Sequence, residues 1–100
     1  MVRHIILWKI KEELRGEERA SAMKKAKDSL ESLLGVVPGL IKIHVYTEKL
    51  PSSNADMMLE CEFESAEALA VYRDHPAHVA AANSFVRPIT AERTCMDFEA

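Results

Sequence analysis

The sequence predicts an α+β fold of the ferredoxin-like βαββαβ type, in which helices cover one face of a four-stranded antiparallel sheet. Segments rich in β-branched and alternating apolar residues predict the strands, at Val2–Ile10, Leu40–Tyr46, Met57–Phe63 and about Ala91–Phe98. Apolar residues at three- and four-residue steps predict the helices between them. A chain of 100 residues has room for one core, so we expect a single domain over residues 1–100.

The first strand, Val2–Ile10, is apolar on both faces. Its alternation places His4, Ile6, Trp8 and Ile10 on one face and Ile5 and Leu7 on the other. A strand of this kind is expected to be covered on both sides.

The first helix is expected over Glu17–Leu34, where small and aliphatic residues form one apolar stripe. Gly35 and the Val36–Gly39 segment indicate a turn before the second strand. Ser65 is expected to cap a second helix that runs through Tyr72. His75 and Pro76 then start a short helix with proline at its first position, and Pro88 ends it. Its expected packing residues are Ala77, Ala81, Ala82 and Phe85.

The second strand is expected to carry Ile41, Ile43 and Val45 on one face and Lys42, His44 and Tyr46 on the other. Ile41, Ile43 and Val45, together with Ile5 and Leu7, would then lie on a sheet face that the helices leave uncovered. A second copy packed sheet to sheet would bury that apolar surface, so we expect a homodimer.

The composition excludes several classes of function. A formal charge of −3 and a pI of about 5.8 argue against nucleic-acid binding. No apolar run is long enough to cross a membrane, and no signal-peptide pattern follows Met1. Cys61 and Cys95 lack CxxC spacing, so both are expected to be buried thiols in the reducing cytoplasm. No glycine-rich phosphate loop occurs, and we expect no cofactor.

The segment Tyr72–His78 (YRDHPAH), together with His4, contains the candidate functional residues. Histidine titrates near neutral pH and often transfers protons, so His4 and His78 could form an acid/base site with Tyr72. His44 or Tyr46 could also contribute to such a pocket. The alternatives are structural: His4 bonded to the backbone, Tyr72 as a core residue, and His75 as a helix cap.

A metal site is a weaker alternative. His75 and His78 could share a helix face, but zinc requires at least a third ligand with suitable spacing. We therefore expect no metal.

Several motifs resemble the Dabb family, the stress-responsive dimeric α/β-barrel domains. The similarity lies in the opening HIILWKIK at His4–Lys11, the Pro38–Gly39 turn, Phe63–Ser65 (FES), Tyr72, His75–Val79 (HPAHV) and the closing Met96–Phe98 (MDF). These motifs span nearly the whole chain in the family's order.

The resemblance implies a ferredoxin-like protomer whose sheet pairs with that of a second protomer. A few members are polyketide cyclases, in which a strand-one histidine and the second histidine of HPxH catalyse an aldol closure. Those positions correspond to His4 and His78, and the cyclase tyrosine corresponds to Tyr72. The chain departs from the cyclases around Lys49–Asp56 and at Met57–Met58, so the substrate does not carry over.

We therefore expect a stress-responsive dimeric α/β-barrel protein of undefined biochemical activity, in which the His4/Tyr72/His78 pocket either holds a small apolar molecule or is filled by the protein's own side chains. The alternative is a cyclase or lyase-like enzyme that uses the same residues. A dimeric α/β-barrel monooxygenase is a third reading, supported only by analogy of architecture.

Overall fold

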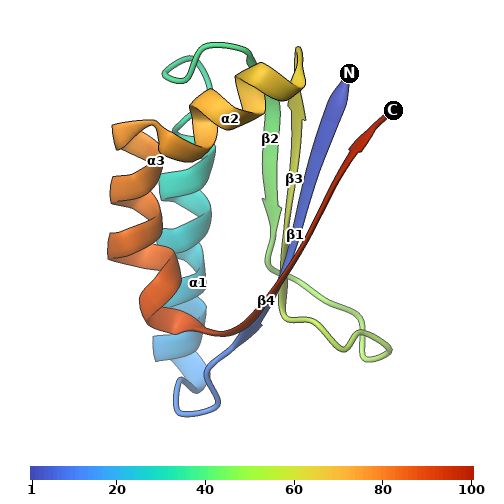
Figure 1. Ribbon diagram of the computed structural model, residues 1–100. Coiled ribbons are helices and arrows are strands. Elements are labelled where there is room, and N and C mark those ends of the chain that lie inside the picture. Colours follow the sequence, from blue (N-terminus) through green and yellow to red (C-terminus); the bar gives the residue numbers. More distant parts are fainter.

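The computed structural model describes residues 1–100 and shows a four-stranded antiparallel sheet with helices on one face (Figure 1). The predicted ferredoxin-like βαββαβ class is confirmed. In chain order, the elements are β1 (Val2–Ile10), α1 (Gly16–Glu31), β2 (Leu40–Tyr46), β3 (Met57–Phe63), α2 (Ala66–Asp74), α3 (Pro76–Ala81), a π-helical turn (Ala82–Val86), a 3-10 turn (Arg87–Ile89) and β4 (Thr90–Glu99).

The sheet order is β2-β3-β1-β4, so β1 and β3 are central and β2 and β4 are the two edges. Both neighbours of β1 run antiparallel to it, and His4 lies opposite Cys61 on one side and Asp97 on the other. Side chains opposite each other in an antiparallel pair point to the same face. The topology therefore brings His4 and Asp97 together although the two residues lie at opposite ends of the chain.

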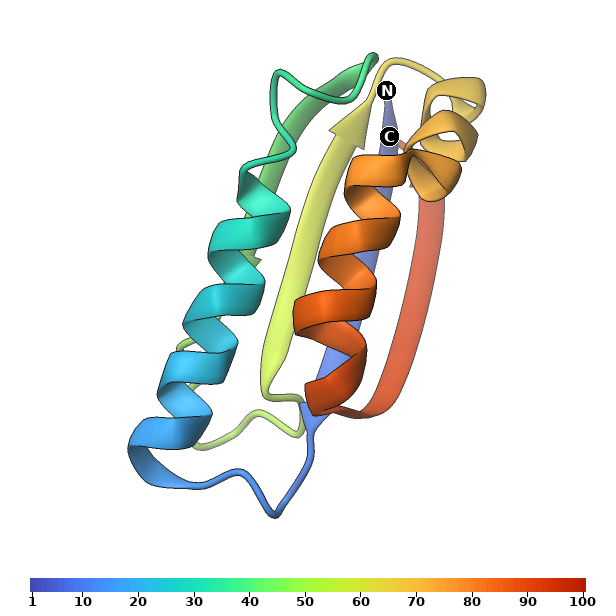
Figure 2. The same ribbon diagram turned by 90° about the vertical axis from the view of Figure 1, so that its left-hand side faces the viewer.

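The core lies between the sheet and the helices, which form a layer in front of it (Figure 2). Alternate residues of β1 and β3 face this layer, as the period of two in their sequences predicts. Tyr72 of α2 and Phe63 of β3 are the largest side chains that are fully buried. Helix α1 contributes Met23, Ala26 and Leu30 to the same core.

The predicted helix starts around Tyr72 are confirmed. The Ser65 side chain accepts a hydrogen bond from the backbone N–H of Ala68 and caps α2. The Nδ1 atom of His75 accepts one from the N–H of Ala77, and Pro76 occupies the first turn of α3. Helix α1 ends at Glu31, earlier than predicted, because the chain tightens into i→i+3 turns that precede Gly35.

Ile41 does not share a face with Ile43 and Val45, contrary to the prediction. The β2–β3 register shifts between Leu40 and Lys42, and the extra residue Ile41 points away from the core. Ile43 and Val45 are consequently buried beneath the helices. The prediction that all three residues lie on the sheet face without helices is therefore wrong for Ile43 and Val45. It holds for Ile41, which is exposed.

Phe85 and Cys95 are also more exposed than the sequence indicates. The π turn adds a residue to the helical turn and rotates the positions that follow, which leaves Phe85 41% exposed. Cys95 is exposed because β4 is an edge strand that the helical layer does not cover. Cys61 is buried, as predicted, and both thiols are free.

The face of the sheet opposite the helices carries a set of exposed apolar side chains from several strands. In Figure 1 this face has no helix over it. We call this set the outer apolar face; it comprises Leu7, Ile41, Tyr46, Met96 and Phe98. None of the helices is both long and apolar enough to span a membrane.

Candidate functional site

A cavity of about 460 Å³ lies between the α3–π turn segment and the sheet, on the side of β1 and β4. Ile6, Trp8 and Leu59 of the sheet and Val79, Ala82 and Val86 of the helical segment form its apolar wall. The polar groups at its margin are those of Tyr72, His78, Thr90 and three arginines. Two of the wall residues belong to the π turn, a conformation found frequently at functional sites.

Tyr72 and His78 lie close together because the helix is interrupted between them. Tyr72 lies in the last turns of α2, and His75 both ends that helix and caps α3. Pro76 fixes the first turn of α3, in which His78 follows. The centres of the Tyr72 and His78 rings are consequently 4.2 Å apart.

The His78 ring is held in one tautomer. Its Nδ1 lies 3.1 Å from the carbonyl oxygen of Arg73, which can only accept a hydrogen bond, so Nδ1 carries the proton. Burial lowers the pKa of His78, and neighbouring positive charges that include Arg87 and Arg93 lower it further against the effect of that hydrogen bond. A neutral His78 therefore has a free lone pair on Nε2 and can act as a base.

The Tyr72 side chain is only 1% exposed, and its hydroxyl has no hydrogen-bond partner of ordinary geometry. Burial raises the pKa of Tyr72 strongly, and the nearby thiol of Cys61 adds to this effect. Burial likewise raises the pKa of Cys61 to about 12. Both groups are therefore protonated at neutral pH, and the acceptor beside the hydroxyl is only the weakly accepting sulfur of Cys61.

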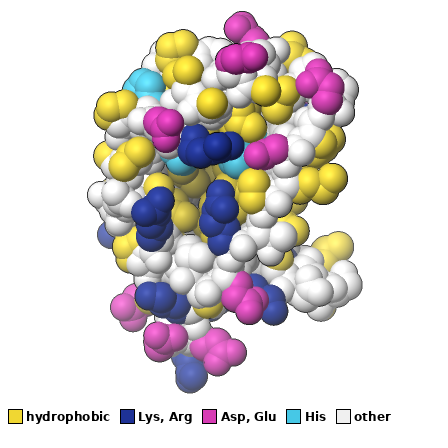
Figure 3. Space-filling view, viewed as in Figure 1, with side chains coloured by type: hydrophobic (Ala, Val, Ile, Leu, Met, Phe, Trp, Pro, Cys, Tyr) yellow, Lys and Arg dark blue, Asp and Glu magenta, His cyan; other side chains and the backbone are white.

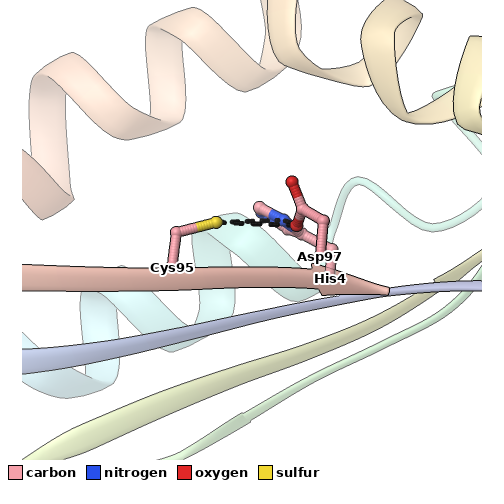
Figure 4. Close-up of side chains that lie close together, drawn as sticks. All are labelled: His4, Cys95 and Asp97. Carbon is pink, nitrogen blue, oxygen red and sulfur yellow. Dashed lines mark hydrogen bonds and ion pairs between the residues drawn. The ribbon is translucent and has the colours of Figure 1, made fainter. Parts of the chain in front are cut away.

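His4 lies next to Tyr72 but faces a different partner. The two ring centres are 6.0 Å apart, and Nδ1 of His4 donates a hydrogen bond to the Asp97 carboxylate (Figure 4). Partial burial acts to raise the pKa of Asp97, but the bond from His4 and the charge of Arg73 outweigh it and lower that pKa. Asp97 therefore fixes the orientation and tautomer of the His4 ring.

Cys95 completes this cluster on β4. Its Sγ lies 3.5 Å from the Asp97 carboxylate and 3.7 Å from Nδ1 of His4. The ligand atoms of His4, Cys95 and Asp97 lie within 4.8 Å of one another, as in a metal site. Metal binding would, however, require Nδ1 to lose the proton that it donates to Asp97. Burial and the Asp97 charge raise the pKa of Cys95, so its thiol is a poor ligand and a poor nucleophile at neutral pH.

The structure brings Tyr72 and His78 to the cavity and places His4 behind Tyr72, where it does not line the cavity. His44 and Tyr46 lie on β2, at the opposite edge of the sheet, and do not belong to this site. Asp97, Arg87 and Arg93 have no role that the sequence alone predicts. Arg93, Cys95 and Asp97 occupy alternate positions of β4, so their side chains lie on the same face of the sheet. This alternation is visible in the sequence.

Comparisons with known proteins agree with this architecture. The family profile of the stress responsive A/B barrel domain (Dabb) matches residues 2–100. No curated protein sequence matches significantly. Among solved structures, a dimeric protein of unknown function with a ferredoxin-like fold from Bacteroides fragilis is 29% identical, with a TM-score of 0.91 over 99% of this chain and 95% of that one.

Two further structures share the fold at lower identity. A dimeric ferredoxin-like protein of unknown function from Thermobifida fusca is 22% identical, with a TM-score of 0.83 over 99% of this chain and 90% of that chain. A hydroxynitrile lyase from Passiflora edulis is 17% identical, with a TM-score of 0.78 over 97% of this chain and 90% of that chain. Since the family profile covers nearly all of the sequence, the chain belongs to the stress responsive A/B barrel domain (Dabb) family.

Proposed function

We propose that residues 1–100 act as a single domain that binds a small, largely apolar molecule in the cavity beside Tyr72 and His78. The cavity itself carries the proposal: at about 460 Å³ it has the size of a small-molecule site, and eight of its 13 lining residues are hydrophobic. The unpartnered hydroxyl of Tyr72 supports it as well, because a buried hydroxyl is costly unless a ligand supplies the acceptor.

The binding unit in this proposal is a homodimer formed through the outer apolar face. That face exposes 64% of Met96 and 39% of Leu7 in the isolated protomer, and a contiguous apolar surface favours association. The relatives from Bacteroides fragilis and Thermobifida fusca are described as dimeric. The cavity lies on the helical side of the sheet, so dimerisation through the outer apolar face would leave its lining intact.

The cytoplasm is the proposed location, because two free thiols are compatible with a reducing compartment. The acidic net charge favours a small molecule over nucleic acid as the ligand.

A second candidate function is acid/base catalysis on the bound molecule, as in a cyclase or lyase. Nε2 of a neutral His78 would remove a proton from a carbon next to a carbonyl group, leaving an enolate. The Tyr72 hydroxyl would donate a hydrogen bond to the developing enolate oxygen. Attack of the enolate carbon on a second carbonyl of the same molecule would form the carbon–carbon bond, and His78 would return its proton to the new alkoxide.

Two observations favour this second candidate. The hydrogen bond to Arg73 leaves the Nε2 lone pair of His78 free, and the ring is within 4.2 Å of that of Tyr72. A hydroxynitrile lyase is among the proteins with this fold, so the fold can accommodate an enzyme. Asp97 would hold His4 as a positioning residue behind Tyr72.

Ligand-dependent thermal unfolding tests the binding function. A panel of small aromatic and polyketide-like compounds is screened against the wild type and His78→Ala, because a compound that binds only the folded state raises the melting temperature. We expect a compound that raises the melting temperature of the wild type and has a much smaller effect on His78→Ala.

His75→Asn is the matched control, since it removes a histidine outside the cavity while asparagine can still cap α3. This variant should respond like the wild type. A panel without any effect on the wild type would contradict the proposal.

A further inference from the structure

Three arginines from separate elements converge on the margin of the cavity. Arg73 comes from the last turn of α2, Arg87 from the 3-10 turn and Arg93 from β4. In Figure 3 basic side chains gather around a hollow with a hydrophobic floor and histidine atoms beside it. No aspartate or glutamate lines the cavity, although the chain as a whole carries a formal charge of −3.

Arg87 and Arg93 have no carboxylate partner, which sets them apart from most basic side chains of this protein. The basic residues with a carboxylate within 4 Å are Arg3, Lys9, Arg19, Lys24, Lys27, Lys42, Lys49 and Arg73. The partner of Arg73 is distant, at 3.9 Å from the Asp97 carboxylate, and the Arg73 side chain is 63% exposed.

Electrostatics at the neighbouring residues supports this convergence. Burial is the main cause of the lowered pKa of His78, and the charges of Arg87 and Arg93 lower it further. The charge of Arg93 also acts to lower the pKa values of Tyr72 and Cys95, against the larger effect of burial. Like charges gathered beside an apolar wall repel one another when no anion is present. An anionic group bound there would remove this repulsion and satisfy the planar guanidinium groups.

We propose that the ligand of this cavity consists of an apolar body with one anionic group, a carboxylate or a phosphate, and that Arg87 and Arg93 bind that group. The inference rests on the proposed function, because it names the ligand class of the same cavity. Arg73 supplies a third positive charge at the rim. The apolar body lies against Trp8 and Val86, and the anion at the rim orients it so that its far portion reaches Tyr72 and His78.

The test compares ligands that share one apolar body and differ in charge. 4-Phenylbutanoate, its neutral primary amide and 4-phenylbutyl phosphate are titrated into the wild-type protein by calorimetry. We expect at least one anion to bind ten-fold or more tightly than the amide, with an advantage that decreases as salt is added. The carboxylate and phosphate titrations then identify which anionic group the site prefers.

Variants assign the preference to the arginines. Arg87→Gln and Arg93→Gln are each expected to weaken binding of the preferred anion by about ten-fold and to leave amide binding unchanged, because each removes one charged hydrogen bond to the anion. Arg93→Lys keeps the charge and should keep part of the preference. Arg15→Gln, which removes an exposed arginine outside the cavity, is the control and should behave like the wild type.

The outcomes separate the two proposals. Equal affinity for the amide and both anions in the wild type, combined with loss of binding in His78→Ala, would overturn the anion preference and keep the cavity as the binding site. Anion binding that survives both glutamine substitutions would also overturn it. Absence of binding by any of the three compounds, together with no thermal effect from the wider panel, would overturn the proposed function and this inference with it.

Discussion

Replacing Tyr72 by phenylalanine should stabilise the ligand-free protein, an unusual direction for a change at a fully buried position. The side chain is 1% exposed, and its hydroxyl has no hydrogen-bond partner. A buried polar group without a partner costs about 1–3 kcal/mol, and Tyr72→Phe removes that cost. The phenylalanine ring retains the packing of the tyrosine ring against Phe63 and His78, whose ring centres lie 5.0 and 4.2 Å away.

The expected gain is about 1 kcal/mol, which corresponds to a rise of about 4–8 °C in the melting temperature of a domain of this size. The assay is thermal and urea unfolding of the wild type and Tyr72→Phe without ligand. Both proteins are measured at the same concentration, because a dimer's apparent stability depends on it.

Tyr72→Leu is the control that measures the contribution of the aromatic ring to packing. It removes the hydroxyl and the aromatic contacts together, and it should destabilise the protein by about 2–4 kcal/mol because a cavity remains. If Tyr72→Phe were less stable than the wild type by 1 kcal/mol or more, the hydroxyl would have a partner in the folded protein. That result would show that the Tyr72 hydroxyl is not available to donate a hydrogen bond to a ligand.

Three further predictions concern the turn before β2, the Asp97 carboxylate and the outer apolar face. Gly39→Ala should cost more stability in urea unfolding than Gly35→Ala: both glycines have positive φ, but a Cβ on Gly39 would meet the Ala68 Cβ at 2.6 Å, whereas one on Gly35 meets nothing. Equal losses would contradict this. Partial burial acts to raise the pKa of Asp97, but the His4 bond lowers it overall, so this carboxylate stabilises the fold above its unfolded pKa of about 4 and ceases to do so as the pH falls through its folded pKa. The stability difference between the wild type and Asp97→Asn should therefore be large at pH 7 and shrink below about pH 4; a difference independent of pH would contradict a stabilising hydrogen bond from His4 to the Asp97 carboxylate. Leu7→Lys should convert a dimer into a folded monomer in light scattering, because Leu7 points away from the core; an unchanged mass would argue against this interface.

The strands were predictable because side chains that face the core alternate with side chains that do not, and apolar residues recur at every second position. The bounds of β1, β2 and β3 agree with the prediction to the residue. The wrong face assignments, at Ile43 and Val45 in β2 and at Phe85 after α3, both result from an inserted residue: the bulge at Ile41 and the π turn. Each inserted residue changes which face the neighbouring side chains occupy. No glycine or proline within the bulge or the π turn indicates its position in the sequence.

The candidate site was predictable only in part. The Tyr72–His78 pair is local, since a proline after a capping histidine fixes how α3 follows α2. The partner of His4 is not local, because Asp97 reaches it through strand pairing across 93 positions of the chain. The arginines belong to three different elements, and no spacing in the sequence encodes their convergence on the cavity.

The most direct test of the ligand site is a titration of the wild-type protein with 4-phenylbutanoate, followed by NMR of the histidine rings. The chain has four histidines, and only His78 lines the cavity. We expect the ring signals of His78 to shift and saturate, while those of His75 and His44 stay in place. Saturable shifts at His44 without any at His78 would contradict the assignment of this cavity as the binding site, as would no saturable shift at any histidine with 4-phenylbutanoate, 4-phenylbutyl phosphate or any compound of the wider panel.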